Sequence, residues 1–294
     1  MNSVAAVVVT YNRKQLLETC IEKLSQSSYP CDILLIDNGS TDGTKDLIDS
    51  KFPEIIYHNT GANLGGAGGF RVGMEIAVQK GYEYVWIMDD DTFVNPDTLG
   101  KLMEVDEKLD GNYGFLSSAA YWIDGSLCNM NIQRTAMNTK VEDLTSEYSP
   151  IIMATFVSFF VKSSIIREMG LPIKEFFIWS DDLEYSRRVS MKYPCYFVPG
   201  SAVEHHMGSN AKVGIESEST DRLWRYEYLY RNEVYVFRRE GFRGYIYLWL
   251  RVLLHTFRII TKAKDDKKIK LKTVWKSFMS GFKFHPPVEY VSES

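Results

Sequence analysis

The chain has 294 residues, 45% of them hydrophobic and 24% charged, which is the composition of an ordinary globular protein with room for a substantial core. Its formal net charge of −4 hides an asymmetry, because residues 243–283 hold eleven Lys and Arg against two Asp, about +9, which leaves about −13 for the remainder. A basic appendage on an acidic body suits an anionic surface and, since no nucleic-acid motif is present, speaks against a nucleic-acid partner.

The cysteines and the apolar runs indicate the compartment. Four cysteines show neither the paired spacing of a metal site nor a disulfide framework, so we expect a reducing environment. No stretch reaches the roughly 18 uninterrupted apolar residues of a spanning helix, and the N-terminus lacks the features of a secretory signal. We therefore expect a cytoplasmic protein, peripheral on the inner face of the cell membrane.

Strand and helix patterns alternate from the N-terminus. Apolar runs predict strands at residues 4–9, 32–37, 55–58 and 85–88, with helical spacing between them. This alternation predicts an α/β fold with an open, largely parallel sheet and right-handed crossovers. In such sheets ligands bind outside the carboxyl ends of the strands, where this chain places Asn12, Asp37, Asn63 and Asp89–Asp91.

The acidic run Asp89–Asp91 closes the apolar strand pattern at residues 85–88. Three carboxylates at the end of a buried strand repel one another and resist desolvation unless a cation sits beside them. A hard divalent metal supplies that cation and can carry substrate phosphates in its remaining positions. An isolated triplet could equally be a solvated turn or a helix cap, so the rest of the chain must decide.

A glycine cluster occupies residues 65–69, just before a helical pattern and Arg71. Glycine permits positive φ and close backbone approach, so these amides could face phosphate or sugar hydroxyls. The spacing matches neither the dinucleotide fingerprint nor the Walker pattern, and a flexible turn is the alternative. We favour a loop that faces a diphosphate or a sugar.

Two further groups of polar residues lie in the second half of the chain. Asp181 and Asp182 fall in the first turn of a predicted helix, where they are either capping residues or a general base beside an aromatic wall. His205 and His206 follow a predicted strand and are candidates for a metal ligand.

Taken together, these pieces resemble a family 2 glycosyltransferase of the GT-A fold. The resemblance spans roughly residues 3–240 and rests on six ordered motifs: Val-Val-Val-Thr-Tyr-Asn-Arg13, Ile-Asp37-Asn-Gly-Ser-Thr-Asp-Gly-Thr, Asn63-Leu-Gly-Gly-Ala-Gly-Gly-Phe, Asp89-Asp90-Asp91, Trp-Ser-Asp181-Asp182-Leu-Glu184-Tyr and Val203-Glu-His205-His-Met-Gly208. Within the family the chain most resembles galactofuranosyltransferases, with bacterial rhamnosyltransferases close behind. This motif commonly starts with Glu, whereas this chain has Asp181, whose side chain is shorter but carries the same charge.

The resemblance implies a role for each motif. Residues expected to bind the nucleotide-sugar donor are Thr10, Tyr11, Asn12, Asp37, Asn63, Gly65, Gly66, Arg71 and Asp90. Residues expected to hold Mn²⁺ or Mg²⁺ are Asp89, Asp91 and His205, with His206 as the alternative. Asp182 is expected to be the catalytic base, and the residues expected to shape the acceptor pocket are Trp179, Asp181 and Glu184.

This set of residues suits inverting sugar transfer, in which a metal neutralises the leaving diphosphate and one carboxylate deprotonates the acceptor hydroxyl. We expect galactofuranose to pass from UDP-galactofuranose to a lipid-linked bacterial surface glycan, with dTDP-rhamnose as the alternative donor. A nucleotidyltransferase would also use strand-end acids and a metal, but the chain has no N-terminal Gly-rich loop bearing Lys or Arg for a triphosphate.

The C-terminal part is predicted to be helical and separate in character. We expect a catalytic domain over residues 1–220 and a basic helical region over residues 221–294. In residues 245–262, Arg251, His255, Arg258 and Lys262 fall on one helical face, and apolar residues supply the remaining surface. Such a helix suits an anionic membrane surface, and a homodimer interface is the alternative.

Overall fold

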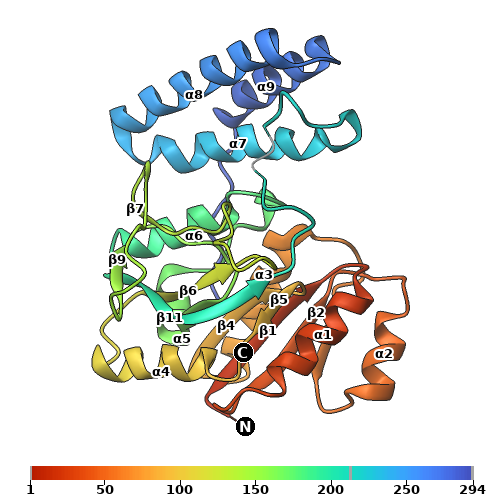
Figure 1. Cartoon of the computed structure of the whole chain (residues 1–294), viewed down its shortest axis with the longest axis vertical. Coiled ribbons are helices and arrows are strands. Elements are labelled where there is room, and N and C mark those ends of the chain that lie inside the picture. Colours follow the sequence, from red (N-terminus) through yellow and green to blue (C-terminus); the bar gives the residue numbers. More distant parts are fainter. Residues whose placement is uncertain (1, 212–213, 293–294) are drawn as a thin grey trace.

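The computed structural model describes residues 2–211 and 214–292. Figure 1 shows an α/β body with a layer of three helices, α7, α8 and α9, stacked against one end of it. The α/β class and the mostly parallel sheet expected from the strand and helix alternation are confirmed.

The body is built on one nine-stranded sheet, in which eight strands follow the order β3-β2-β1-β4-β10-β6-β11-β5 and β9 pairs with β11. Its strands are β1 (Val4–Thr10), β2 (Asp32–Asp37), β3 (Ile56–Asn59), β4 (Tyr84–Asp89), β5 (Thr92–Val94), β6 (Phe115–Tyr121), β9 (Ser149–Ile151), β10 (Phe159–Lys162) and β11 (Cys195–His205). A separate two-stranded hairpin consists of β7 (Arg134–Ala136) and β8 (Thr139–Lys140).

Strand directions place several carboxyl ends at one edge. The pairs β1–β2, β1–β4, β2–β3 and β6–β11 are parallel, whereas β10 runs antiparallel to both β4 and β6. Because β10 reverses direction between them, β4 and β6 point the same way, and so does β11. The ends of β1, β2, β4 and β11 therefore meet at the same edge of the sheet, where the predicted site residues lie.

Helices cover both faces of the sheet. Their bounds are α1 (Lys14–Leu24), α2 (Thr44–Lys51), α3 (Gly65–Gln79), α4 (Thr98–Lys108), α5 (Ser163–Met169), α6 (Asp181–Ser190), α7 (Trp224–Arg238), α8 (Gly241–Lys262) and α9 (Lys267–Gly281), with short 3₁₀ turns at Lys174–Phe176 and Thr220–Arg222. Apolar residues of α1, α2 and α4 pack on one face of the sheet, and those of α3, α5 and α6 pack on the other. Every residue of β1 is buried and successive side chains point alternately into the two cores, which is why that strand is almost entirely apolar.

The glycine cluster is not the loop that we expected, because α3 already begins at Gly65. A Cβ on Gly69 would come within 2.5 Å of Val9 Cγ1, and one on Gly73 within 2.3 Å of Val7 Cγ1. These glycines let the helix lie directly on β1. Their pattern therefore reflects close helix–strand packing.

The helical layer has its own apolar core, formed mainly by α7, α8 and α9. The arrangement of α8 differs from the expectation of an outward basic face. Arg251 Nε donates to Glu233 Oε2 of α7 at 2.8 Å, and His255 Nδ1 hydrogen-bonds the Tyr230 hydroxyl at 2.6 Å. Both side chains thus point toward α7, and large apolar side chains point outward. In the described part of the chain, no helix is long and apolar enough to cross a membrane.

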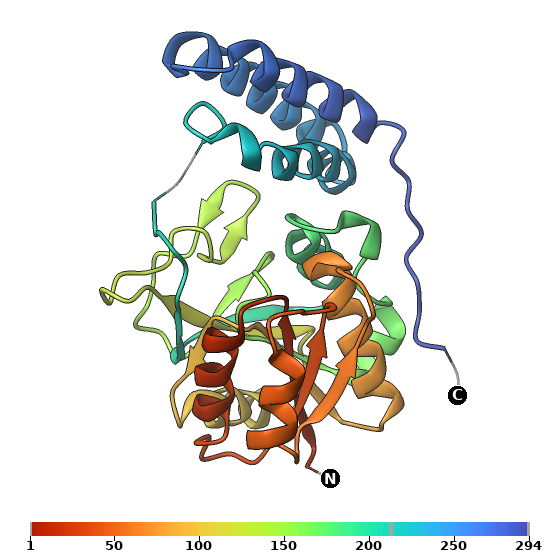
Figure 2. The ribbon, with the colours of Figure 1, turned by 90° about the vertical axis from the view of Figure 1, so that its right-hand side faces the viewer.

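After α9 the chain returns to the body, which Figure 2 shows as a descending segment along one side. Leu171 N donates to Glu289 O at 2.8 Å, and the Glu289 carboxylate pairs with Arg71 at 2.9 Å and Lys174 at 2.5 Å. The segment that follows the three helices is therefore packed on α3 and on the loop after α5.

Candidate active site

Three predicted metal ligands meet at the carboxyl edge. Asp89 ends β4, Asp91 follows in the turn before β5, and His205 ends β11. One ligand atom from each of the three lies within 4.8 Å of the other two, and His205 Nε2 is 3.0 Å from Asp91 Oδ1. Two carboxylate oxygens and an imidazole nitrogen are a donor set that suits Mn²⁺ or Mg²⁺.

Arg13 supplies a cation that sequence analysis did not assign to this cluster. Its Nη1 lies 2.6 Å from Asp91 Oδ2 and 3.3 Å from Asp90 Oδ1, and its side chain is half exposed. Thr10 Oγ1 donates to Asp90 Oδ2 at 2.7 Å, so Asp90 is held against the end of β1 and lies outside the group of metal-ligand atoms. Part of the repulsion in the acidic run is thus offset by the protein itself.

The pKa values in this cluster diverge. Burial raises the pKa of Asp90 to about 7, although Arg13 and the Thr10 hydroxyl oppose the shift. Burial also acts on Asp91, but hydrogen bonds and charges from His205 and Arg13 leave its pKa below the ordinary value. Burial lowers the pKa of His205, but the hydrogen bond to Asp91 and the Asp89 charge overcome this and raise it to about 10. A protonated imidazole and a guanidinium therefore supply positive charge at the position suited to a metal.

Only one of the two histidines faces the acids. His205 Nδ1 lies 3.0 Å from Asn131 Oδ1, an atom that can only accept, so Nδ1 carries the hydrogen and Nε2 points toward Asp91. His206 Nε2 instead contacts Glu204 at 3.0 Å, and its ring packs on Phe93. The alternative metal ligand, His206, therefore lies outside the cluster.

The residues expected to hold the nucleoside gather where β1 and β2 end. Asp37 is fully buried and accepts from the Tyr57 hydroxyl at 2.6 Å and from Ser40 N at 2.7 Å. Asn12 Oδ1 accepts from Thr41 N at 2.7 Å, which ties the β1 turn to the β2 loop, and the neighbouring Tyr11 ring is 43% exposed. The Tyr11 ring thus lies at the surface, beside a hydrogen-bonded polar loop.

Other predicted donor-binding residues have different surroundings. Asn63 Oδ1 accepts from Gly65 N at 2.9 Å, before the first turn of α3. A Cβ on Gly65 would lie 2.1 Å from the Phe177 carbonyl oxygen, whereas Gly66 meets only the Phe70 ring at 3.8 Å. Gly65 therefore lies against protein backbone, which differs from the expected contact with a diphosphate.

Arg71 does not reach the acidic cluster. Its guanidinium pairs with Glu75 at 2.6 Å and with Glu289 of the C-terminal segment at 2.9 Å. Glu75 belongs to α3 and also contacts Ser292 of that segment, and Glu289 belongs to the segment itself. The structure thus assigns Arg71 to packing of the chain terminus, contrary to the expected donor contact.

Asp181 and Asp182 form a second acidic pair, at the start of α6. Desolvation raises the pKa of Asp182 to about 6, and the pKa of Asp181 is also raised by burial and by the Asp182 charge. The Asp89 charge raises both values, so this pair and the first acidic cluster act within one electrostatic environment. Among the described residues, neither carboxylate forms an ion pair, although Arg134 lowers the pKa of Asp182 in part.

Trp179 lies just before this pair, half buried, with its ring edge-on to Tyr226 of α7 at 5.2 Å. The aromatic wall expected beside Asp182 is thus shared with the helical layer. The side-chain amide of Asn232, also on α7, donates to the Trp179 carbonyl at 2.9 Å.

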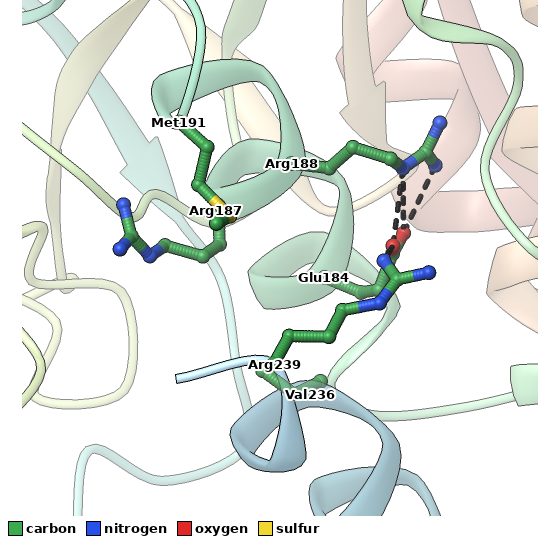
Figure 3. A pocket seen from close by; sticks show the side chains of 6 residues that line it. All are labelled: Glu184, Arg187, Arg188, Met191, Val236 and Arg239. Carbon is green, nitrogen blue, oxygen red and sulfur yellow. Dashed lines mark hydrogen bonds and ion pairs between the residues drawn. The ribbon is translucent and has the colours of Figure 1, made fainter. Parts of the chain in front are cut away.

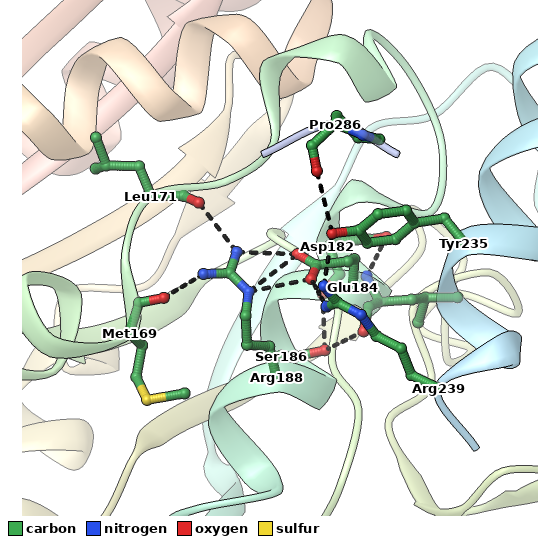
Figure 4. Close-up of polar contacts among 10 residues, drawn as sticks. Met169, Leu171, Asp182, Glu184, Ser186, Arg188, Tyr235, Arg239 and Pro286 are labelled. Atoms are coloured by element: carbon green, nitrogen blue, oxygen red, sulfur yellow. Dashed lines mark hydrogen bonds and ion pairs between the residues drawn. The ribbon is translucent and has the colours of Figure 1, made fainter. Parts of the chain in front are cut away.

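Glu184 has a different environment from the expected acceptor pocket. Its side chain is 1% exposed and pairs with Arg188 at 2.9 Å and with Arg239 at 2.6 Å (Figure 4). A pocket of about 360 Å³ lies beside this contact, and Figure 3 shows that arginines of α6 and of the end of α7 line it. Arg187 there pairs with Glu240 at 2.5 Å. Ion pairs beside this pocket thus join α6 to the helical layer.

Sequence analysis missed three side chains with direct contacts in this region: Arg13, Asn131 and Asn232. Arg13 stood within a recognised motif, so the need for a cation beside Asp89–Asp91 could have pointed to it. Asn131 and Asn232 carry no such signal, because their partners lie 74 and 53–56 residues away in the sequence.

The sequence comparisons with known proteins agree on one family. The sequence profile of the family described as Glycosyl transferase family 2 matches residues 5–166. Galactofuranosyltransferase GlfT1 of Mycobacterium tuberculosis is 27% identical over 273 residues, covering 85% of this chain and 87% of the relative. The N-acetylglucosaminyl-diphospho-decaprenol L-rhamnosyltransferase of the same species is 43% identical, over 60 residues and 20% of each chain.

Solved structures share the fold at lower sequence identity. The mannosyltransferase PcManGT from Pyrobaculum calidifontis, solved in complex with GDP-Man and Mn²⁺, superposes with a TM-score of 0.57 at 15% identity. The match covers 97% of this chain and 76% of that chain. The GT-A architecture expected from the motifs is thereby confirmed.

Proposed function

The chain belongs to glycosyl transferase family 2 and is a glycosyltransferase, and on this premise we propose that it moves galactofuranose from UDP-galactofuranose to a hydroxyl of a lipid-linked glycan, with inversion. The observation that supports this reaction type best is the contrast between two acidic clusters: Asp89–Asp91 has imidazole and guanidinium partners, whereas Asp181–Asp182 has no ion pair with any residue that the structure describes. The relatives named galactofuranosyltransferases, which cover most of the chain, support the donor.

We assign the donor end to the edge formed by β1, β2 and β4. Asp37 and Asn12 would hold the nucleoside, beside Tyr11, Thr10 and Asn63. Asp89, Asp91 and His205 would hold Mn²⁺ or Mg²⁺, which when bound neutralises the leaving diphosphate. As a ligand, His205 would offer a deprotonated Nε2, and Arg13, which pairs with the other oxygen of Asp91, would be placed beside an anionic donor.

We assign the proton-accepting role to Asp182. A carboxylate with a pKa near 6 is ionised at neutral pH and is a stronger base than an ordinary aspartate, so it suits removal of the acceptor proton. Burial and the Asp182 charge raise the pKa of Asp181, so it would lie beside the base with its neutral form favoured, and Trp179 would form the wall against which an acceptor sugar packs. We interpret Glu184 as the residue that holds α6 against the helical layer, because both of its oxygens are taken by arginines.

The remaining organisation is proposed on the same basis. Residues 1–220 would form the catalytic domain and residues 221–294 a basic helical region at the inner face of the membrane. A lipid-linked acceptor would then be reached from that surface. The alternative is that the helical region forms a homodimer interface.

The experiment that tests the function is donor turnover against a panel of nucleotide sugars, with EDTA and with added Mn²⁺, in the presence of a lipid-linked acceptor. Metal-dependent release of UDP from UDP-galactofuranose supports the proposal. Release from dTDP-rhamnose alone would transfer the assignment to a rhamnosyltransferase, which the 43% identical segment of the L-rhamnosyltransferase favours. Turnover that EDTA does not affect would contradict the metal role.

A further inference from the structure

We propose that the outer face of α8 docks on the surface of an anionic lipid bilayer. This outer face comprises large apolar side chains of the helix that are exposed: Phe242, Tyr245, Ile246, Leu250, Leu253, Leu254, Phe257 and Ile260. They are between 38% and 80% exposed, and they recur at the spacing of one helical face.

Unlike a normal surface helix, α8 is apolar on both sides, because its inner side buries Leu248, Val252 and Ile259 in the core of the helical layer while its outer face is exposed. Its inner side carries Arg251, paired with Glu233, and His255, bonded to Tyr230, together with the small contact residue Gly244. A Cβ on Gly244 would lie 1.8 Å from the Phe237 carbonyl oxygen, so α8 lies directly on the end of α7 and cannot simply rotate its outer face inward. An exposed apolar surface of this extent, on a helix whose other side is fixed by an ion pair, a hydrogen bond and apolar packing, indicates a partner.

The geometry fits a helix that lies in the plane of a membrane. At 22 residues α8 is about 33 Å long, and it belongs to no membrane-spanning segment among the described residues. Figures 1 and 2 both place α8 on the side of the helical layer remote from the sheet. The body would therefore not obstruct contact between this helix and a flat surface.

Charge selects an anionic surface as the partner. Cationic residues that are exposed near the two ends of the helix are Arg243, Lys262, Lys264, Lys267 and Lys268, and α8 itself contains no acidic residue. Only Asp265 and Asp266 interrupt the positive charge of residues 243–283. A symmetric contact between two copies would bring these cationic ends close to one another, whereas anionic lipid headgroups neutralise them.

The test uses the full-length protein and vesicles that contain no glycan acceptor, so its outcome does not depend on transferase activity. In flotation with vesicles containing about one third phosphatidylglycerol, the wild-type protein should bind. The double variant Leu250→Glu/Phe257→Glu should bind at least about tenfold less, because it replaces apolar contact by negative charge. Ile123→Glu, at a residue 59% exposed on the body, is the matched control and should bind like wild type.

A second pair of substitutions tests the charge contribution. Lys264→Glu/Lys268→Glu should weaken binding to anionic vesicles, and raised salt should weaken binding of the wild-type protein. Absence of vesicle binding by the wild-type protein, or undiminished binding by the Leu250/Phe257 variant, would overturn the proposal. So would a wild-type dimer that does not bind vesicles and that the same double variant converts to monomers, since α8 would then be the contact between copies.

A different observation carries a second inference, which rests on the proposed role of Asp182. We infer that Asn232 of α7 is a positioning residue for the loop at residues 176–180, which leads directly into Asp181 and Asp182. Phe177, Trp179 and Ser180 have φ values of 62°, 65° and 66°. Non-glycine residues rarely adopt this conformation, so the loop needs outside contacts to remain in it.

Asn232 supplies those contacts from the helical layer. Its fully buried Nδ2 donates to the carbonyl oxygens of Phe176, Ile178 and Trp179, at 3.0, 3.2 and 2.9 Å. Arg231 Nε donates to Asn232 Oδ1 at 3.0 Å, which orients the amide. On the opposite side, Ala67 N at the start of α3 donates to the Phe177 carbonyl at 3.3 Å. The loop is therefore held between α3 and α7.

Two substitutions separate positioning from packing. Asn232→Asp has nearly the same shape but replaces the donor by an acceptor that faces carbonyl oxygens, and Val234→Ala removes apolar packing elsewhere on α7. We expect Asn232→Asp to lower kcat by about 100-fold with little change in the KM for the donor, as a misplaced catalytic group would. Hydrogen exchange in residues 176–182 should accelerate in this variant, whereas Val234→Ala should leave both measurements close to wild type.

Equal exchange in the Asn232→Asp variant and the wild-type protein would overturn this inference, whatever the enzymatic activity. Equal loss of kcat in the Asn232→Asp and Val234→Ala variants would also overturn it. If the wild-type protein transfers no sugar from any donor, the failure belongs to the proposed function, and the exchange measurement still decides the role of Asn232.

Discussion

The two acidic clusters of the site, Asp89–Asp91 and Asp181–Asp182, are stabilised in different ways. The first lies at the end of a buried strand and has cationic partners, His205 and Arg13, within hydrogen-bonding distance. The second lies at the first turn of a helix and forms no ion pair among the described residues. Desolvation raises the pKa of Asp182, whereas paired cations keep the pKa of Asp91 low.

This difference indicates the chemistry for which each cluster is suited. A carboxylate that is paired with exchangeable cations can accept a metal in their place at little electrostatic cost. A buried carboxylate that lacks such a partner has a raised pKa and therefore takes up a proton more readily. Because the Asp89 charge acts on both Asp181 and Asp182, we propose that the two clusters serve one site, which binds an anionic leaving group and removes a proton.

The largest expected effect comes from removing the charge of Asp182. Asp182→Asn should lower kcat by on the order of 10³-fold while Mn²⁺ binding is retained, because only the proton acceptor is lost. Single-turnover transfer and a Mn²⁺ titration check this pair of expectations. Asp46→Asn, in the first turn of α2, is the control for a simple effect on a helix start. Full activity of the Asp182 variant would show that the two clusters do not differ as proposed.

Removing the charge of Asp91 should affect metal binding, which is the function proposed for the first acidic cluster. Asp91→Asn should lower the rate by on the order of 10²-fold and weaken Mn²⁺ binding, since it removes a ligand and leaves His205 and Arg13 without their partner. His205→Ala should behave in the same way. His206→Ala and Glu204→Gln are the matched controls, because these two side chains pair with each other outside the cluster. A metal response lost in the His206 variant would contradict the geometry.

A smaller effect is expected from Asn131, which orients His205 without touching Asp91. Asn131→Ala should weaken Mn²⁺ binding by about 10- to 100-fold, because the imidazole loses the acceptor that fixes its protonated nitrogen. Isothermal titration with Mn²⁺ measures this change. The pH dependence of transfer should stay as in wild type, since Asp182 is unaffected.

The smallest effect is a pH dependence that distinguishes the clusters. Because desolvation raises the pKa of Asp182 to about 6, and a base must be ionised, kcat should fall about tenfold per pH unit below pH 6 and be level above pH 7. The measurement is kcat from pH 5 to 8 at saturating Mn²⁺. An acid limb that moves with Mn²⁺ concentration would instead assign the titration to Asp89–Asp91.

Much of the body was predictable because local patterns determine it. Apolar runs located β1, β2 and β4, and alternation with helices implied that the carboxyl ends of these strands share an edge. Asp37, Asp89 and Asp91 could therefore be expected near one another before their contacts were known. His205 could be named only with His206 as an alternative. The sequence does not show which of two adjacent side chains at a strand end points toward the acids.

Other features depended on contacts between distant segments. The glycines of α3 were interpreted as a ligand loop, but Gly69 and Gly73 serve close approach to Val9 and Val7. Arg71 and Glu184 were assigned to substrate, whereas the C-terminal segment and α7 supply their partners. For α8, the periodicity identified two faces correctly but could not tell which one meets α7, because that depends on Glu233 and Tyr230.

The returning C-terminal segment makes the helical layer an insertion in the body. The chain enters the layer before α7 and leaves it after α9, and Glu289 is then held by Arg71 and Lys174. A hinge motion of the layer would have to bend the chain at both crossings and break these ion pairs. Truncation after residue 242 would also remove a clamp on α3, so a shortened protein would not report on α8 alone.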